Sequence, residues 1–246
     1  MATSEHRRQV RIMAAIERAY QPRIAAELAR SYAIMAETFA DAGYVPDVPD
    51  HEQRMRDILE DMANVAVRAI GGRVFVQAGE KQAPIRLERK DFASTMAKIA
   101  MRYIMLEAFR RHIVDIAETT RAQIIAAVQR GYSEGLGQSG VASIVRDLVP
   151  SLSRHRSAVI ARTETHGAAS YGGFAAAQET GLELRKEWVA AEDERTREDH
   201  AAMNGTTIAM GEAFEFPGYT LMYPGDPSGP PEGIINCRCT LAYVPE

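Results

Sequence analysis

The residues with the most distinctive chemistry lie near the C-terminal end of the sequence. The chain has two cysteines, Cys237 and Cys239, which stand one residue apart in the motif NCRC. A disulfide between them would close a very small, strained ring, so we expect two free thiols. Zn²⁺ takes cysteine and histidine ligands in a tetrahedron, and the two thiols with His200 could form such a site. Candidates for a fourth ligand are Asp193, Asp199 and His166.

The same two cysteines have a plainer interpretation as small core residues. Free cysteine is among the most buried residue types and packs like a small hydrophobic side chain. The sequence contains neither HExxH nor CxxC…CxxC, so the spacing alone does not identify a zinc site. Both interpretations stay open at the level of the sequence.

A third interpretation is catalytic. A pair formed by Glu164 and His200 could do general acid–base work, for instance on a phosphodiester. Together with Cys237 and Cys239 this would give a metal-assisted hydrolase or nuclease. Arg162 and Glu164 are two positions apart on a predicted helix and point about 200° from each other, so they do not face one pocket unaided. We favour ion pairs that fasten the helix, and we assign no catalytic residue.

These residues belong to a predicted C-terminal module of mixed structure. Residues 153–179 form a helix rich in Ala and Gly, which predicts close packing against another element. The segment LELRKEWVA predicts a strand because Leu182, Leu184 and Trp188 fall on alternate positions. Thr196 could cap a short helix, REDHAAM, and short extended pieces follow. In a final strand, CRCTLAYV, Cys237 and Cys239 would point to one side.

The preceding half of the chain has the three- and four-residue apolar spacing of helices. We expect a helix over 5–40 with a kink or a break near Gln21, because Pro22 follows, and a helix over 51–70 ended by Gly71 and Gly72. RVFVQ, at 73–77, predicts a short strand or an extended link. A helix over 91–119 follows, and a capping box from Thr120 to Gln123 starts the next. A helix beginning at Ser139 or Ser143 comes last.

The fold class is therefore α+β: a helical N-terminal region, then a small mixed α/β module with short antiparallel strands. We expect a mainly helical N-terminal region over 1–150 and the C-terminal module over 151–246. Four further histidines on helical segments are expected at the surface: His6, His51, His112 and His155. Met96, Met101 and Met105 have helical spacing and suit a core or a partner-facing surface.

Composition excludes several classes of protein. The 246 residues are 46% hydrophobic and 25% charged, which argues against global disorder, and two cysteines do not build a disulfide scaffold. The net charge of −4 argues against a DNA-coating protein and leaves at most weak, salt-sensitive DNA contact through stretches such as Arg154-His155-Arg156. The sequence has no apolar run of membrane-spanning length and no signal peptide, so we expect no membrane partner.

An ordered set of motifs resembles the phage Mu F-like minor head proteins, the phage head morphogenesis family. The set comprises IARTET, the Trp188 strand, DERTREDHAAMNG and YPGDPSGPPEGIINCRC, and it extends from about Thr119 to the C-terminus. Within these motifs the resemblance implies structural roles for six residues: Arg162, Glu164, Trp188, Asp193, Gly205 and Asn236.

The resemblance also implies a biological role. It implies a non-enzymatic structural protein of a tailed-phage or prophage particle, associated with the portal or inner capsid during head assembly and DNA packaging or delivery. Its partners would be the portal protein and other head proteins. Its location would be the virion head interior or portal vertex, with the host cytoplasm during assembly. Some members carry C-x-x-C where this chain has Arg197 and His200, so one ligand of a four-ligand zinc site is missing here.

Overall fold

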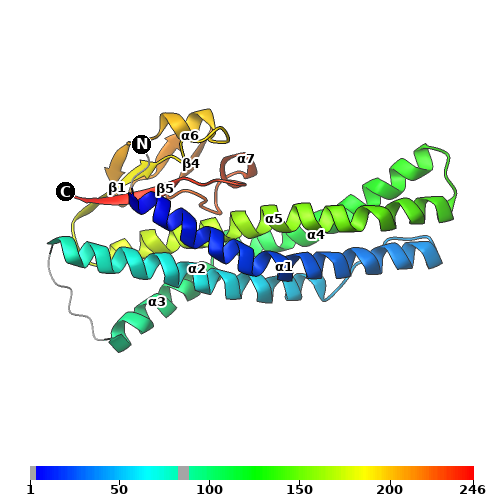
Figure 1. Cartoon of the computed structure of the whole chain (residues 1–246), viewed down its shortest axis with the longest axis horizontal. Helices are drawn as coiled ribbons and strands as arrows, with labels where there is room; N and C mark the ends of the chain where they lie inside the picture. The colour runs from blue at the N-terminus through cyan, green and yellow to red at the C-terminus, as the bar shows by residue number, and fades with distance from the viewer. Residues whose placement is uncertain (1–3, 83–88) are drawn as a thin grey trace. The chain divides into compact units, whose positions relative to one another are not determined.

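The computed structural model describes residues 4–82 and 89–246 (Figure 1). Long helices come first, followed by a region of short helices and short strands, so the α+β prediction is confirmed. The long helices are α1 (Ser4–Ala42), α2 (His51–Gln82), α3 (Arg89–Ile104), α4 (Glu107–Ser133) and α5 (Gln138–Glu179). The later elements are β1 (Leu184–Val189), α6 (Glu198–Ala202), β2 (Thr207–Ala209), β3 (Phe214–Phe216), β4 (Tyr219–Leu221), α7 (Pro231–Ile234) and β5 (Thr240–Pro245).

The chain divides into two compact units, each assembled from separate stretches of sequence. The first unit comprises residues 1–18, 60–109 and 162–246, and the second comprises 19–59 and 110–161. Helices α1, α2, α4 and α5 each contribute residues to both units. All the short strands belong to the first unit, together with every candidate site residue from Arg162 onward.

Two prolines lie inside continuous helices. Of the two alternatives near Gln21, the break is wrong, since α1 continues through Pro22, and α5 likewise continues through Pro150. Both prolines are exposed, whereas Tyr20 and Ile24 beside Pro22 are buried. An interior proline costs about 3 kcal/mol through its lost hydrogen bond and its clash with the preceding turn. Burial of the apolar stripe on the opposite face outweighs this cost.

The predicted helix end at Gly71 is wrong, and so is the predicted short strand or extended link at 73–77. Helix α2 runs through this segment, and Val74 and Phe75 are buried as helical residues. Gly71 lies against α5, because a Cβ atom at Gly71 would stand 2.7 Å from the carbonyl oxygen of Gly172. Glycine serves here as a site of close helix contact rather than as a helix stop. The small residues of α5 therefore permit the close packing that their composition predicts.

The predicted helix boundary at Thr120 is also wrong. The segment 91–119 belongs to two helices, because α3 ends at Ile104 and α4 runs from Glu107 to Ser133. Thr120 is buried in the middle of α4, and its hydroxyl donates to the carbonyl of Ile116 at 2.6 Å. The apolar stripe continues through Ile116 and Ile124, so tertiary packing overrides the capping pattern.

The strands form two small antiparallel sheets. The three-stranded sheet has the order β2-β1-β5, and β3 pairs with β4 in a hairpin. In the central pairing, Trp188 lies opposite Leu241 and Lys186 lies opposite Tyr243. The predicted strand over the Trp188 segment and the predicted short antiparallel strands are therefore confirmed. At its first residues α1 adjoins this sheet, where His6 and Thr240 form a buried hydrogen bond of 2.8 Å.

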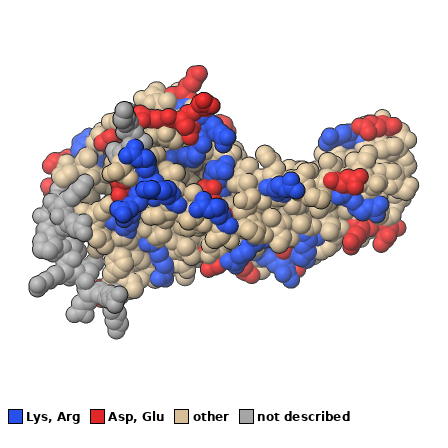
Figure 2. Space-filling view, in the orientation of Figure 1, with Lys and Arg blue, Asp and Glu red and all other residues tan. Residues whose placement is uncertain are grey.

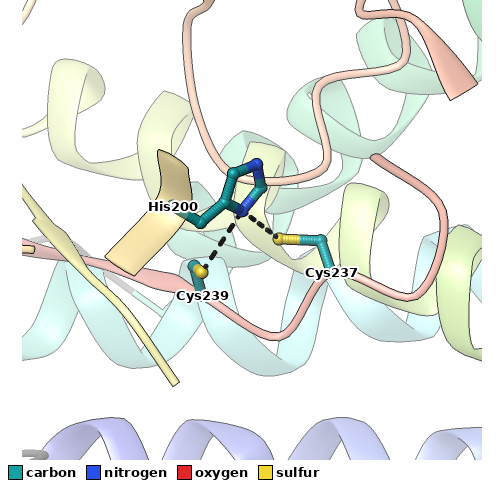
Figure 3. Close-up of side chains that lie close together, drawn as sticks. All are labelled: His200, Cys237 and Cys239. Atoms are coloured by element: carbon teal, nitrogen blue, oxygen red, sulfur yellow. Dashed lines mark hydrogen bonds between the residues drawn. The ribbon is translucent and has the colours of Figure 1, made fainter. Parts of the chain in front are cut away.

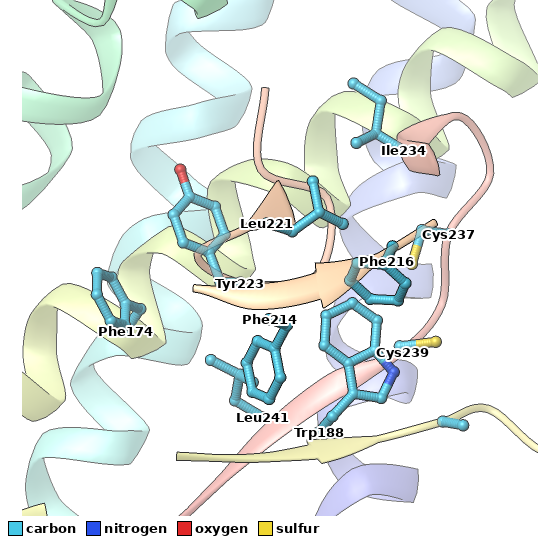
Figure 4. Close-up of a cluster of buried hydrophobic side chains, with 11 residues drawn as sticks. Phe174, Trp188, Phe214, Phe216, Leu221, Tyr223, Ile234, Cys237, Cys239 and Leu241 are labelled. Atoms are coloured by element: carbon cyan, nitrogen blue, oxygen red, sulfur yellow. The ribbon is translucent and has the colours of Figure 1, made fainter. Parts of the chain in front are cut away.

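An aromatic core joins the sheet, the hairpin and the end of α5 (Figure 4). Trp188 is fully buried, and its ring centre lies 5.1 Å from that of Phe214 and 5.2 Å from that of Phe216. The complete cluster is Phe174, Trp188, Ala190, Phe214, Phe216, Leu221, Tyr223, Ile234, Cys237, Cys239 and Leu241. Both cysteines thus adjoin closely packed rings. None of the described helices has the length and apolar character needed to cross a membrane.

Candidate functional site

His200, Cys237 and Cys239 converge in the first unit and form what we term the thiol–imidazole group (Figure 3). His200 lies on α6, and the cysteines lie in the segment between α7 and β5. The His200 Nδ1 atom is 3.6 Å from the Sγ atom of each cysteine. All three side chains are buried, and their candidate ligand atoms lie within 4.8 Å of one another. The sequence therefore identified three residues that the fold brings together.

The cysteines do not lie in a strand, as the sequence analysis expected. Strand β5 begins at Thr240, and Asn236 adopts a left-handed backbone conformation with φ 59° just before Cys237. Asn236 is fastened to α5, because its backbone N–H donates to Thr163 Oγ1 and its side-chain oxygen accepts from Arg162. Two motif residues, Arg162 and Asn236, therefore hold the segment that carries the thiols.

Hydrogen bonds fix the orientation of the His200 ring. The Tyr219 hydroxyl donates to Asp199 Oδ2 at 2.6 Å, so its oxygen can accept a hydrogen bond from His200 Nε2 at 3.3 Å. With its hydrogen on Nε2, the imidazole presents the lone pair of Nδ1 to the two sulfurs. Trp188 packs edge-on against the ring at 5.2 Å between centres. Burial, followed by the hydrogen bond to Asp199, raises the pKa of Tyr219 well above its ordinary value, so the hydroxyl keeps its proton.

The two sulfurs have different electrostatic environments. A hydrogen bond with Cys237 is the largest contribution that lowers the pKa of Cys239, and His200 lowers it further. The same hydrogen bond, together with burial, raises the pKa of Cys237. Backbone N–H groups also approach the sulfurs: that of Ala191 bonds to Cys239, and that of Cys239 bonds to Cys237. The site therefore provides donors for negative charge on sulfur.

None of the three proposed fourth ligands belongs to the thiol–imidazole group as the described residues define it. Asp199 accepts from Tyr219, and Asp193 accepts from Arg238 at 2.8 Å. His166 is buried, and neither ring nitrogen has a hydrogen-bond partner in the described structure. Burial lowers the pKa of His166 to about 3, so its ring is neutral at physiological pH. It packs against Gly225, which has φ +75°.

The residues of the catalytic alternative do not assemble around the thiols. Glu164 is buried on α5, but within the described residues it is not part of the thiol–imidazole group. Arg162 lies 3.5 Å from Glu17 and bonds to Asn236, which is a fastening role. The geometry therefore provides a compact set of soft ligands rather than an acid–base pair.

The remaining motif residues position α6 against β1. Gly205 has φ +80°, and its N–H donates to the carbonyl of Trp188 at 2.8 Å. The side-chain oxygen of Asn204 accepts from the N–H of Ala190 at 2.9 Å. The N-cap position of α6 is Arg197, with no side-chain capping bond, so the expected cap by Thr196 is wrong. The turn that returns to the sheet therefore anchors His200 more than the start of its helix does.

A small cavity of about 10 Å³ lies beside the thiol–imidazole group. Besides the three group members, it is lined by Ala191, Arg195, Thr196, Arg197, Asn236 and Arg238. Arg197 is held by its own contact, a 2.6 Å hydrogen bond to the carbonyl of Ile235. The cavity therefore provides space for about one water-sized ligand next to the sulfurs and His200 Nδ1.

Sequence reasoning missed the role of Tyr219 and misplaced two histidines. Tyr219 belongs to a two-stranded hairpin, and nothing in its spacing from His200 connects the two residues. His6 and His51 were expected at the surface but are buried. His6 bonds to Thr240, and His51 bonds to Glu27. Each of the two histidines falls on the buried face of its helix, and this position in the helical repeat was the signal that the sequence offered.

Comparison with known proteins identifies the part of the chain that carries this site. Residues 122–242 match the family described as Phage Mu protein F like protein. Residues 122–242 belong to this family. The complete thiol–imidazole group lies within the matched residues of this Mu F-like chain, as do Arg162, Trp188 and Tyr219.

Three curated relatives match parts of the chain. Minor head protein GP7 of Bacillus phage SPP1 is 32% identical over 143 residues, which cover 52% of this chain and 44% of that protein. The NAD(+)–arginine ADP-ribosyltransferase EFV of Enterococcus faecalis (strain ATCC 700802 / V583) is 33% identical over 88 residues, or 35% of this chain and 18% of that enzyme. The uncharacterized protein YqbB of Bacillus subtilis (strain 168) is 30% identical over 100 residues, or 39% of this chain and 33% of that protein.

The chain spans less than half the length of each of these relatives. The match to the transferase covers so little of that enzyme that its name does not identify an activity for the Mu F-like region. No solved structure matches the chain.

Proposed function

We propose that this chain is a non-enzymatic minor head protein of a tailed phage or prophage particle. In this role it associates with the portal or the inner capsid during head assembly and DNA packaging or delivery. The observation that carries the proposal is the family match over residues 122–242, together with 32% identity to a minor head protein, GP7 of phage SPP1. The proposed location is the virion head interior or portal vertex, and the host cytoplasm during assembly.

The fold supports a role based on protein contacts. The sheet and hairpin share one aromatic core and form a compact docking module. On and beside α3, Met101 and Met105 are 59% and 54% exposed, whereas Met96 is buried. Flexible methionine side chains suit contact surfaces that adapt to a partner. The two exposed methionines are therefore the surface that we assign to the portal or another head protein.

The charge distribution supports protein contacts more than DNA binding. Figure 2 shows both basic and acidic side chains over the face that it draws. In the stretch Arg154-His155-Arg156, the Arg156 guanidinium donates to Tyr32 and Thr120 inside the second unit. This stretch therefore offers fewer free cations to DNA than its sequence suggests, and any DNA contact through it is weak.

Co-expression with the portal protein of the same phage or prophage tests the proposal. We expect the two proteins to co-purify through an affinity tag on the portal, and the chain to sediment with assembled heads. A non-cognate portal protein provides the matched control for specificity. If the chain binds the cognate portal no better than this control, and purified heads do not contain it, the proposed function is wrong.

A further inference from the structure

We propose that the thiol–imidazole group binds one zinc ion through His200 Nδ1, Cys237 Sγ and Cys239 Sγ, with water in the fourth position. The inference rests on the geometry of these residues and does not depend on the proposed role in phage heads.

The distances match those of a tetrahedral zinc site. With zinc about 2.3 Å from sulfur and about 2.0–2.1 Å from nitrogen, a tetrahedral angle sets the nitrogen–sulfur separation at about 3.5–3.6 Å. The Nδ1 atom of His200 lies 3.6 Å from Cys237 Sγ and 3.6 Å from Cys239 Sγ. Both nitrogen–sulfur separations therefore have the value that coordination needs.

The proton on the imidazole is placed on the nitrogen that faces away from the sulfurs. The Tyr219 hydroxyl donates its hydrogen bond to Asp199, so its oxygen is available to accept one from the N–H at Nε2 of His200. This is the arrangement that orients metal-binding histidines, whose second nitrogen donates to a neighbouring group. Hydrogen bonding alone explains the site less well, since one Nδ1 lone pair accepts well from one thiol and two sulfurs are equally near.

Charge balance also favours a divalent metal ion. When zinc binds, both thiols release their protons, and two thiolates balance the charge of Zn²⁺ at a buried position. An unbalanced charge there would carry a large desolvation cost. Backbone N–H groups of Ala191 and Cys239 are already directed at the sulfurs and stabilise the thiolates. Sulfur and imidazole ligands in a tetrahedral set select zinc over Mg²⁺ or Ca²⁺.

The fourth position suits a water molecule. Asp193, Asp199 and His166 lie outside the group, whereas the adjoining cavity of about 10 Å³ accommodates one water. Bound zinc would join α6 to the segment before β5. The two ligands His200 and Cys237 are 37 residues apart in the sequence. Helix α6 spans five residues and lacks a side-chain N-cap, so this tether would stabilise it. We assign the ion this structural role.

Cobalt substitution of the full-length protein tests the site directly. We expect the reduced, metal-free protein to bind one equivalent of Co²⁺, with an ultraviolet sulfur-to-cobalt charge-transfer band and strong tetrahedral bands in the visible. One equivalent of Zn²⁺ should remove these bands and protect both thiols from a disulfide reagent. A folded protein that binds neither ion, or whose thiols react equally with and without Zn²⁺, overturns the proposal.

Variants assign the ligands. Cys237→Ser, Cys239→Ser and His200→Ala should each weaken zinc binding by more than about 100-fold. Tyr219→Phe keeps the ring that stacks on Phe216 and removes the hydroxyl, so the fold is preserved while zinc affinity falls about 10-fold. Tyr132→Phe, at an exposed position in the second unit, is the matched control and should bind zinc as the wild type does. Unchanged zinc affinity in folded Cys239→Ser contradicts the ligand set, and unchanged affinity in Tyr219→Phe contradicts the proposed orientation of His200 by Tyr219.

Discussion

Lys186 is a buried cation at the centre of the three-stranded sheet. Its Nζ atom donates to the carbonyl of Met222 at 2.8 Å and lies 4.8 Å from the ring centre of Phe174. Burial lowers the pKa of Lys186 from its ordinary value of 10.5 to about 8, although Asp226 and Glu212 oppose the shift. Between these two pKa values the unfolded chain binds the proton and the folded chain does not. Stability due to Lys186 therefore rises with pH across this window.

This gives a measurable dependence on pH. Linkage predicts that Lys186 makes the wild type about 1–2 kcal/mol more stable at about pH 9.5 than at about pH 7.5. Lys186→Met should lose this increment, whereas Lys98→Met, at an exposed position, should keep it. Urea denaturation of the three proteins at both pH values measures the difference. Equal pH slopes in the wild type and Lys186→Met would contradict the prediction.

At the scale of single residues, the sequence predicts what alternation and chemistry encode. Alternate residues of a strand point to the same side, which places Leu184, Lys186 and Trp188 together on one side of β1. All three are buried, so the inward position of the lysine was predictable. The meeting of Cys237, Cys239 and His200 was proposed from residue type. Tyr219 was not predictable, because only the pairing of the hairpin and the position of α6 bring its hydroxyl to His200.

A buried polar network joins the helices of the second unit. The Ser31 hydroxyl and one ring nitrogen of His51 both contact Glu27, and the other ring nitrogen of His51 lies 3.4 Å from Thr120 Oγ1. Thr120 also accepts from Arg156 Nη1 at 2.7 Å. Buried polar groups cost free energy when they lose a partner, so each link of this network contributes to the packing of α1, α2, α4 and α5.

Removal of the Thr120 hydroxyl tests this network. Thr120→Val preserves the shape of the side chain but removes the acceptor for Arg156, so we expect a loss of about 1–3 kcal/mol in the free energy of unfolding. Thr119→Val, at the neighbouring exposed position, should change stability by less than about 0.5 kcal/mol. Chemical denaturation followed by circular dichroism provides both values. Equal stabilities of the two variants would show that the network does not stabilise the unit.

At the scale of elements, apolar spacing predicted the helices, but local signals misplaced their ends. Pro22 and Gly71 were expected to interrupt helices, and Thr120 was expected to start one. The exposed position of Pro22, the close contact of Gly71 with α5 and the buried network at Thr120 all depend on neighbouring helices. Windows of sequence cannot encode such neighbours. The short strands were predicted better, because glycine and proline turns delimit them locally.

In the molecule as a whole, the proposed zinc site and the proposed contact surface lie in different parts of the sequence. The thiol–imidazole group falls within residues 122–242, which match the Mu F-like family. The exposed residues Met101 and Met105 precede this stretch. Both belong to the first unit, so one folded body can combine the proposed zinc site with a separate contact surface.

Substitution of the methionines should therefore separate assembly from folding. Met101→Lys/Met105→Lys places two charges on the proposed contact surface, and we expect binding to the portal protein to weaken at least about 10-fold, a cost of about 1.4 kcal/mol. Circular dichroism and zinc binding should match the wild type, since both side chains are exposed. Val65→Lys/Val76→Lys, at two exposed positions on α2, is the control and should retain binding. Equal portal binding by the two double variants would show that the methionines are not part of the interface. This result would not contradict the proposed zinc site.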